Sequence, residues 1–289
     1  MPSRSPQAQG ILLMLAAIFM FSAMDVLAKT LSATYPVPQV VWARYAGQVA
    51  LTVLVLRARA LPLLRTRHIG MQLTRSVFLF AATCCLFTSF SFMDIASATA
   101  VMNIHPVLLT LGAAVFLAEP LGIKRLVGIL AALVGALIVI RPGADVFSWA
   151  ALLPLLAGIF YASYALTTRM LGRDEDILTS FLYTALVGAV AATFLAVPVW
   201  QTPTAGTWVL FAALGGAGAI GQFLLIRALT VTQAGVVAPF GYAGILLATI
   251  WGVIVFDEWP DAWTLLGAAT IILAGIFVWY RETRARPVV

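Results

Sequence analysis

A few polar side chains interrupt the long apolar stretches of this sequence, and they are the residues that could bind or react. Asn103 and His105 lie beside Pro106 near the centre of one such stretch. A hydrogen-bonding group without a partner in apolar surroundings is costly, so we expect something polar to meet them. That partner is either the carboxylate or ammonium group of a zwitterionic substrate, bound together with backbone groups freed by the proline, or a group on a neighbouring helix.

Aromatic rings and hydroxyl groups gather in two other apolar stretches whose sequences resemble each other. Rings offer apolar area with defined geometry and hydroxyls orient a polar head, so the mixture suits a solute that has both parts. The same residues also suit ordinary helix packing. Including one residue from each of two further stretches, the candidates for contact with a substrate are Phe21, Ser22, Tyr161, Ser163, Tyr164, Gln222 and Tyr242.

Asp25 and Arg44 are charged residues inside apolar stretches, where charges are rare. Counted at 1.5 Å per residue, both lie roughly 8 to 10 Å below the same end of their helices, so they can form an ion pair between adjacent helices. The alternatives are proton coupling at Asp25, a gate, or snorkelling of the long side chain to the surface. The sequence supplies no second acidic residue at mid-depth, so obligatory proton coupling is not indicated.

The chain has no arrangement typical of an enzyme. Catalysis needs a nucleophile with a positioned base, and the sequence has no zinc-peptidase helix, Walker loop or serine elbow. The string from Gly216 to Gly221 fits a dinucleotide-binding pattern, but it lies in an apolar stretch, where close helix packing explains it better. We therefore expect no catalytic residue, no metal site and no cofactor.

The composition predicts that these residues are positioned by helices in a membrane. Of 289 residues, 62% are hydrophobic and 10% charged, whereas a soluble domain is about half apolar and one quarter charged. The mean hydropathy of +1.03 describes the whole chain, so we expect an all-α integral membrane protein. The formal charge of +6 comes from basic residues scattered in short loops, which argues against nucleic acid as a partner.

Ten membrane spans are predicted when the apolar runs are divided at prolines, glycines and charges. A span needs about 20 mostly apolar residues. The predicted spans are 10–30, 37–57, 70–92, 95–118, 123–141, 148–169, 177–198, 206–229, 233–256 and 261–280.

The placement of lysine and arginine predicts the orientation of these spans. Basic residues near span ends are retained on the cytoplasmic side. With both termini in the cytoplasm, only Lys29 and Arg141 of the 17 lysines and arginines fall outside, and Arg44 falls within a span. We expect a multi-pass protein of a bacterial inner membrane.

The sequence contains an internal repeat. Residues 96–139 are echoed by residues 232–278, and residues around Phe19 in the first span match residues around Phe160 in the sixth. The predicted halves are residues 1–145 and 146–289, with five spans each. Because five is odd, the second half enters the membrane in the opposite sense, as in many transporters.

Two prolines interrupt corresponding spans of the two halves. Pro106 lies near the centre of the fourth span, and Pro239 lies in the ninth. Irregular backbone at membrane depth is tolerated where it lines protein or a water-filled cavity, so paired helix breaks point to a central binding site. An ordinary proline kink that aids packing is the alternative.

These features resemble the drug/metabolite transporter superfamily, in its EamA family. The resemblance rests on ten spans, on paired five-helix repeats and on two apolar spans that end in Leu117-Ala118-Glu119 and Phe256-Asp257-Glu258. It implies an EamA-like fold that alternates access to a midplane cavity. Within the family the chain is similar to the YddG-type exporters of aromatic amino acids, although Phe21 and His105 stand where other aromatic residues are expected.

The resemblance implies an inner-membrane transporter that exports small organic solutes, with aromatic or hydrophobic amino acids expected first. A drug, a nucleobase or another metabolite is the alternative within the same fold. A membrane scaffold or embedded enzyme that transports nothing is the alternative from another class. The expected partners are a small-molecule substrate and the lipid bilayer, in a monomer or a homodimer.

Overall fold

The computed structural model describes residues 6–57, 62–116, 123–141, 149–171, 175–231 and 238–285. These residues are helical or irregular, and no strand occurs among them. Helices are expected because every backbone group that faces lipid must be hydrogen-bonded within its own segment. The predicted boundary between residues 145 and 146 and the predicted Leu117-Ala118-Glu119 motif lie outside the described residues.

The first half crosses the molecule five times. Its fourth crossing is divided into two helices, as described below. The elements are α1 (Pro6–Ser32), α2 (Val37–Leu56), η2 (Pro62–Leu64), α3 (Ile69–Ser89), α4 (Ile95–Met102), α5 (His105–Phe116) and α6 (Ile123–Ile140).

The second half repeats this order. A short 3-10 helix stands where the first half has its divided crossing. The elements are η3 (Trp149–Leu152), α7 (Leu153–Leu171), α8 (Ile177–Ala196), η4 (Val197–Val199), α9 (Ala205–Val231), η5 (Ala238–Tyr242), α11 (Ala243–Phe256) and α12 (Ala262–Ala285).

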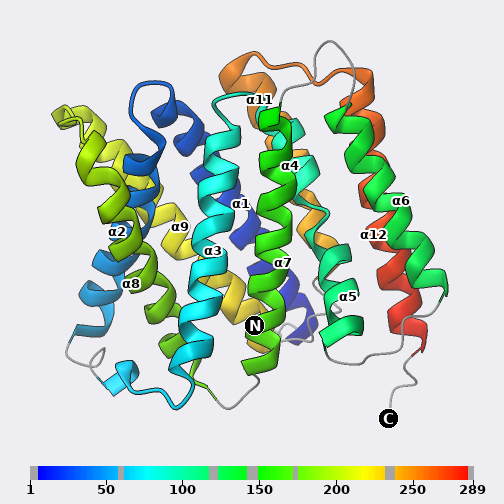
Figure 1. Cartoon of the computed structure of the whole chain (residues 1–289), viewed down its shortest axis with the longest axis horizontal. Coiled ribbons are helices and arrows are strands. Elements are labelled where there is room, and N and C mark those ends of the chain that lie inside the picture. The colour runs from blue at the N-terminus through cyan, green and yellow to red at the C-terminus, as the bar shows by residue number, and fades with distance from the viewer. Residues whose placement is uncertain are drawn as a thin grey trace, which may run out of the picture.

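Length and composition make these helices suitable for a membrane. Six described spans, α4 and α5 counted together, have at least 18 residues and are strongly apolar, and three shorter apolar helices accompany them. With α2, which has 20 residues and contains Arg44, the described elements make the ten predicted crossings. Figure 1 shows them side by side, with α1 beginning and α12 ending at the same end of the molecule. The ten-helix prediction is confirmed.

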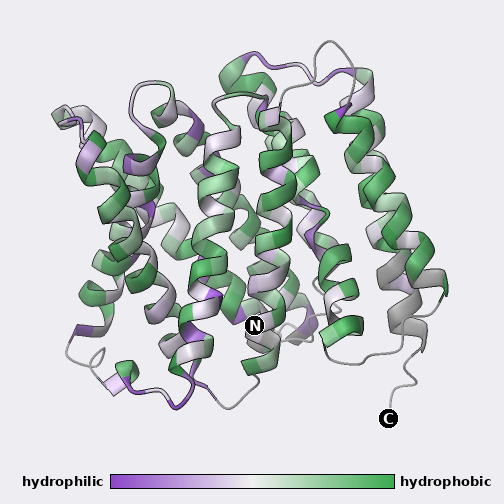
Figure 2. Ribbon diagram, viewed as in Figure 1, coloured by the Kyte–Doolittle hydropathy of each residue, from purple (hydrophilic) through white to green (hydrophobic). Residues whose placement is uncertain are grey.

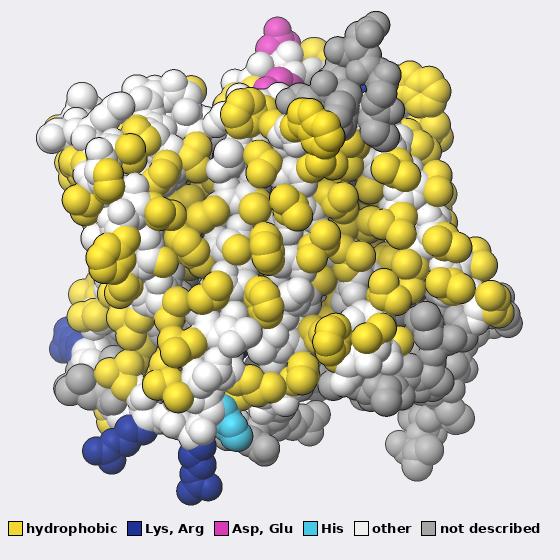
Figure 3. All heavy atoms as spheres, in the orientation of Figure 1, with side chains coloured by type: hydrophobic (Ala, Val, Ile, Leu, Met, Phe, Trp, Pro, Cys, Tyr) yellow, Lys and Arg dark blue, Asp and Glu magenta, His cyan; other side chains and the backbone are white. Residues whose placement is uncertain are grey.

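The outer surface has the pattern expected of a protein in lipid. Large apolar side chains such as Leu130 of α6 and Ile250 of α11 are exposed around the middle of the helices, and apolar residues dominate the ribbons in Figure 2. On the face drawn in Figure 3, the described lysines and arginines gather at the end that bears the termini, and acidic side chains gather at the other. This distribution agrees with the predicted concentration of basic residues on one side.

The packing of helices follows the predicted relation between the two halves. α1 packs against α9 in the same way as its counterpart α7 packs against α3, and α6 packs against its own counterpart α12. Each pair joins a helix of one half to a helix of the other. The chain therefore has an inverted five-plus-five repeat, in which neither half forms a separate unit.

Small residues allow α2 and α9 to cross closely. A Cβ atom added at Gly47 would lie 2.5 Å from the Gly215 Cα, and one added at Gly215 would lie 2.7 Å from the Ala43 carbonyl oxygen. Gly216, by contrast, has no neighbour within 4 Å of an added Cβ. Close approach through small residues is a common way to associate helices in membranes. Within the string from Gly216 to Gly221, for which the sequence predicted such packing, Gly218 and Gly221 lie close to side chains of α1.

Candidate functional site

The fourth crossing departs from α-helix between α4 and α5. α4 ends at Met102 and α5 begins at His105, one residue before Pro106. The Ile104 N–H donates to the Val101 carbonyl, a shorter-range bond than those of an α-helix. In the second half, Pro239 lies within the 3-10 helix η5 that precedes α11. Both prolines thus lie at irregular backbone in corresponding crossings.

Asn103 and His105 flank this break and bind its backbone. The Asn103 side-chain amide donates to the Thr99 carbonyl at 2.8 Å, and His105 Nδ1 donates to the Met102 carbonyl at 3.2 Å. Both residues are half-buried. Each of the two side chains thus bonds a carbonyl of its own crossing, and neither of these two bonds reaches a neighbouring helix.

An aromatic cluster connects the break to α7. The His105 and Tyr161 rings meet edge to face with centroids 4.6 Å apart, and the Tyr161 and Tyr164 centroids are 5.7 Å apart. His105 and Tyr161 are half-buried although they lie within the bundle. These rings provide apolar area at the depth where a substrate was predicted.

Tyr164 and Gln222 belong to a polar network centred on Arg75, a residue that was not among the predicted site residues. Gln222 Nε2 donates to the Tyr164 hydroxyl at 3.3 Å, and Arg75 Nη2 donates to the same hydroxyl at 2.9 Å. Arg75 also donates to the Thr168 hydroxyl at 3.0 Å and to the Ser180 carbonyl at 2.9 Å. This guanidinium is 2% exposed and joins α3 to α7 and α8.

The predicted ion pair between Asp25 and Arg44 is not formed. Arg44 Nη1 instead donates to the Thr83 hydroxyl and, at 2.9 Å, to the Tyr45 hydroxyl. Asp25 Oδ1 and Arg44 Nε are buried without hydrogen-bond partners, as is the Ser22 hydroxyl one turn before Asp25. Asp25 lies seven residues before the end of α1 at Ser32, and Arg44 lies seven residues after the start of α2 at Val37. The Arg44 side chain is directed to the hydroxyl groups instead of to Asp25.

The three remaining substrate-contact candidates, Phe21, Ser163 and Tyr242, have different surroundings. The Phe21 ring is half-buried and lies against the backbone of Gly221 on α9. The Ser163 hydroxyl donates to the Ile159 carbonyl of its own helix at 2.9 Å. Tyr242 is buried in the apolar cluster between η5 and α12, beside Gly275, with its hydroxyl unpaired. Tyr242 therefore lies apart from the rings of the aromatic cluster.

At one end of the bundle an ion pair joins the two halves. Lys29 Nζ at the end of α1 lies 2.6 Å from Glu258 Oε1 beyond the end of α11. Lys29 also donates to the Met93 carbonyl at 2.9 Å, and Glu258 Oε2 accepts the Ile95 N–H that begins α4. This ion pair was not predicted, although both charges were visible at the ends of their spans.

Packing around the divided crossing differs between its two ends. α4, near the ion pair, packs against α1, α3, α6, α7, α11 and α12. The described part of α5 packs mainly against α7, with smaller contacts to α6 and α12. Among the described residues, the crossing therefore packs against more helices at the Lys29 end than at the opposite end.

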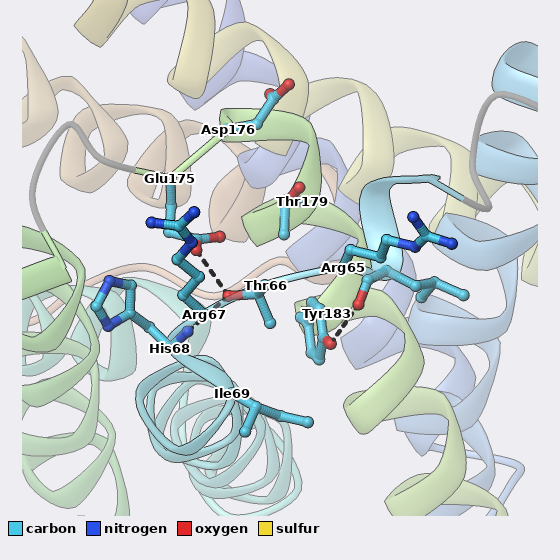
Figure 4. Close-up of a pocket in the computed structure, with 10 residues that line it drawn as sticks. Arg65, Thr66, Arg67, His68, Ile69, Glu175, Asp176, Thr179 and Tyr183 are labelled. Atoms are coloured by element: carbon cyan, nitrogen blue, oxygen red, sulfur yellow. Dashed lines mark hydrogen bonds between the residues drawn. The ribbon is translucent and has the colours of Figure 1, made fainter.

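A surface pocket of about 860 Å³ lies at that opposite end, between the segment leading into α3 and the start of α8. Figure 4 shows Arg65, Arg67 and Glu175 among the side chains that line it. The Glu175 carboxylate accepts a hydrogen bond from the Thr66 hydroxyl at 2.7 Å. No predicted site residue lines this pocket.

The comparisons with known proteins agree with this architecture. The riboflavin transporter of Vibrio cholerae is 32% identical over 96% of this chain and 94% of that protein. The pseudopaline exporter CntI of Pseudomonas aeruginosa is 30% identical over 92% of this chain and 94% of its own length. The S-adenosylmethionine uptake transporter of Rickettsia bellii is 29% identical over 77% and 76%. The expected likeness to aromatic amino acid exporters has no counterpart in these three names.

A solved crystal structure shares the fold. It covers 97% of this chain and 99% of its own chain with a TM-score of 0.66, at 19% sequence identity. The EamA-like transporter family itself matches twice, over residues 8–141 and 148–280, and so accounts for both halves. This chain is a multi-span membrane protein that belongs to the EamA-like transporter family.

Proposed function

We propose that this protein carries a small ring-bearing organic solute across the inner membrane of a bacterium by alternating access. The observation that carries the proposal is the half-buried His105–Tyr161 ring pair beside the break between α4 and α5. A solute ring can lie against these side chains, while backbone groups at the break and nearby hydroxyls meet its polar part. The family membership supports transport instead of catalysis or a scaffold role.

Riboflavin is the first cargo to test. Two of the similar proteins, from Vibrio cholerae and Rhizobium johnstonii, are named riboflavin transporters. Riboflavin carries a flat ring system and a chain of hydroxyl groups, which fits an aromatic pocket with hydrogen-bonding groups at its edge. Aromatic amino acids are the second cargo, because Asp25 and Arg44 offer charges of both signs in the same bundle.

The packing supports a conformation that is closed at the Lys29 end and more accessible from the other. α4 packs tightly beside the Lys29–Glu258 pair, whereas α5 has fewer neighbours in the described part of the chain. With both termini in the cytoplasm, as the basic residues favour, the less packed end faces the cytoplasm. Loading from inside followed by release outside would then be export.

The direction of transport, from the cytoplasm outward, is also a proposal. The similar proteins include one named an exporter and one named an uptake transporter. A carrier without an energy source follows the gradient of its solute, so the same fold serves either direction. Export therefore depends on the solute gradient and on any coupling ion.

Flux into proteoliposomes tests the proposal. We expect vesicles with the purified protein to take up radiolabelled riboflavin or L-tryptophan faster than empty vesicles, and excess unlabelled solute to compete. Tyr161→Ala should slow uptake, while Tyr183→Ala should not, because Tyr183 lines the surface pocket and bonds the Leu64 carbonyl.

Competition with drugs and nucleobases distinguishes the alternative cargoes. If none of these solutes crosses faster than in empty vesicles, the transport proposal is wrong and a scaffold or an embedded enzyme takes its place.

A further inference from the structure

Two opposite charges lie within the membrane on adjacent helices, and neither meets a counter-ion in the described part of the chain. Arg44 is 6% exposed, yet its guanidinium bonds the neutral hydroxyls of Thr83 and Tyr45 and lies 4.8 Å from the centroid of the Tyr45 ring. Its Nε has no partner, and neither has Asp25 Oδ1. A buried charge without compensation is costly, so this arrangement needs an explanation.

The two charges share one region with the candidate ring site. A Cβ atom added at Gly218 would lie 2.9 Å from the Met24 Sδ and 3.5 Å from the Arg44 Cγ, so Arg44 lies beside the turn of α1 that bears Asp25. The Thr83 hydroxyl that Arg44 bonds is on α3, the helix that packs against α7, on which Tyr161 lies. Tyr161 is also the residue whose ring meets His105. Asp25 and the buried, unpaired Ser22 are three residues apart, so they lie on the same face of α1.

We propose that Asp25 and Arg44 form a head-group subsite for a zwitterionic solute of the amino acid type. The Arg44 guanidinium takes the carboxylate, the Asp25 carboxylate takes the ammonium group, and the Ser22 hydroxyl offers a further hydrogen bond. The solute's ring lies toward Tyr161 and His105. This inference rests on the proposed transport function and adds the class of head group that is recognised.

The separation of the two charges favours a ligand that carries both a positive and a negative group. A direct Asp25–Arg44 pair would leave no charge free for a ligand, whereas separated charges are compensated when a zwitterion lies between them. A neutral solute such as riboflavin leaves both charges uncompensated and would be bound through the ring site alone, and a ligand with one charge leaves one. The site should therefore discriminate among compounds that share a ring and differ only in their charged groups.

Binding of three indole compounds to the purified protein in nanodiscs tests the subsite. L-tryptophan carries both charges, tryptamine lacks the carboxylate, and indole-3-propionate lacks the ammonium group. We expect L-tryptophan to bind roughly 10 to 100 times more tightly than either, as the loss of a charge-assisted hydrogen bond implies. Asp25→Asn should abolish the advantage over indole-3-propionate, and Arg44→Gln should abolish the advantage over tryptamine.

The controls separate folding from recognition. Asp25 Oδ1 has no hydrogen-bond partner in the described part of the chain, so Asp25→Asn breaks no bond at this atom and keeps the test decisive if Arg44→Gln fails to fold. Arg44→Lys keeps the charge and should retain part of the preference. Asp257→Asn and Arg65→Gln remove charges at the two ends of the molecule and should leave all three affinities unchanged.

The experiments distinguish failure of the proposed transport function from failure of the proposed head-group subsite. If neither riboflavin nor L-tryptophan crosses the membrane and no indole compound binds, the proposed function itself is wrong. If riboflavin is carried but L-tryptophan binds no better than the other two compounds, the subsite is wrong and the transport function stands. The same conclusion follows if Asp25→Asn weakens all three compounds equally or none of them.

Discussion

Lys29 Nζ lies 2.6 Å from Glu258 Oε1 and thereby joins the end of α1 in the first half to the end of α11 in the second. Asp25 lies one turn before Lys29 on α1, so the ion pair lies one helical turn beyond the Asp25 carboxylate. Neither partner is strongly exposed, with side-chain exposures of 11% and 27%. An exchange of conformation between the halves has to break this contact to open that end.

Glu258→Gln should open the Lys29 end more often. The substitution removes a charge-assisted interaction worth about 1.5 to 3 kcal/mol, enough to shift a two-state population roughly tenfold or more. A cysteine at Ser97, which lies buried near this end, reports the change in a protein that lacks Cys84 and Cys85. We expect a membrane-impermeant thiol reagent to label it faster in Glu258→Gln than in the parent.

The neighbouring Asp257→Asn is the control for that comparison. Its carboxylate accepts a hydrogen bond from Trp259 at 3.2 Å and takes no part in the Lys29 pair. Equal labelling rates in Glu258→Gln and Asp257→Asn would show that the ion pair does not hold this end closed.

Arg75→Met should destabilise the fold. The substitution removes hydrogen bonds to Tyr164, Thr168 and Ser180, each worth about 0.6 to 1.5 kcal/mol, so we expect a loss of about 2 to 4 kcal/mol. Thermal unfolding in detergent measures it, with exposed Arg65→Met as the comparison. A melting temperature for Arg75→Met equal to that of Arg65→Met would contradict a structural role.

His105→Ala should weaken binding of the transported ring-bearing solute by about two- to tenfold. The expected loss corresponds to one edge-to-face aromatic contact, about 0.5 to 1.5 kcal/mol. His105→Phe should retain most of the affinity, because it keeps a ring beside Tyr161. Competition against labelled substrate gives both values, and the ring contact is unimportant if alanine and phenylalanine behave alike.

Gly215→Ala should lower the thermal stability and Gly216→Ala should not, although the two glycines are neighbours. A methyl group at Gly215 meets the backbone of α2, whereas one at Gly216 meets open space. Alanine within a helix is about 0.5 to 1 kcal/mol more favourable than glycine when it fits. Thermal stability should therefore fall for Gly215→Ala and stay equal or rise for Gly216→Ala. Equal behaviour of the two variants would contradict the close α2–α9 crossing.

The Arg141–Asp261 pair between α6 and α12 should make a small, pH-dependent contribution to stability. Burial acts to raise the pKa of Asp261, but the Thr264 N–H and the Arg141 guanidinium outweigh it and hold the pKa below its ordinary value. Because the pKa in the folded state is the lower one, the contribution is complete above about pH 4 and is lost as the pH falls through the folded-state value.

The side chain of Asp261 is half-exposed, so the effect should be less than about 1 kcal/mol. We expect Asp261→Asn to melt slightly below the parent protein at pH 7 and the difference to shrink below pH 4. A difference that is constant with pH would exclude the charge as its cause.

The architecture could be predicted because hydropathy, basic residues and the repeat all act along the chain. Pro106 has no N–H to donate within a helix, so it marked the place where α4 and α5 meet. The positions of Asp25 along α1 and of Arg44 along α2 also follow from counting residues. Such features depend on position in the sequence alone.

The side-chain partners could not be predicted because they depend on rotation about each helix axis. Arg44 reaches the hydroxyl of Thr83 on α3, a choice that residue depth does not determine. Arg75 was counted as a basic residue at the cytoplasmic end, yet it is buried and bonds to α7 and α8. Its position seven residues into α3 was the available signal, since a charge so far inside a span needs partners.

Counterflow through a protein crosslinked at its closed end tests alternating access most directly. Cysteines at Lys29 and Glu258, in a background without Cys84 and Cys85, can be joined by a short cleavable bifunctional thiol reagent. We predict that reconstituted protein exchanges labelled riboflavin or L-tryptophan before crosslinking, loses this exchange when crosslinked, and regains it after the linker is reduced. Exchange that persists with the crosslink complete, or that never exceeds the rate of empty vesicles, would contradict the account.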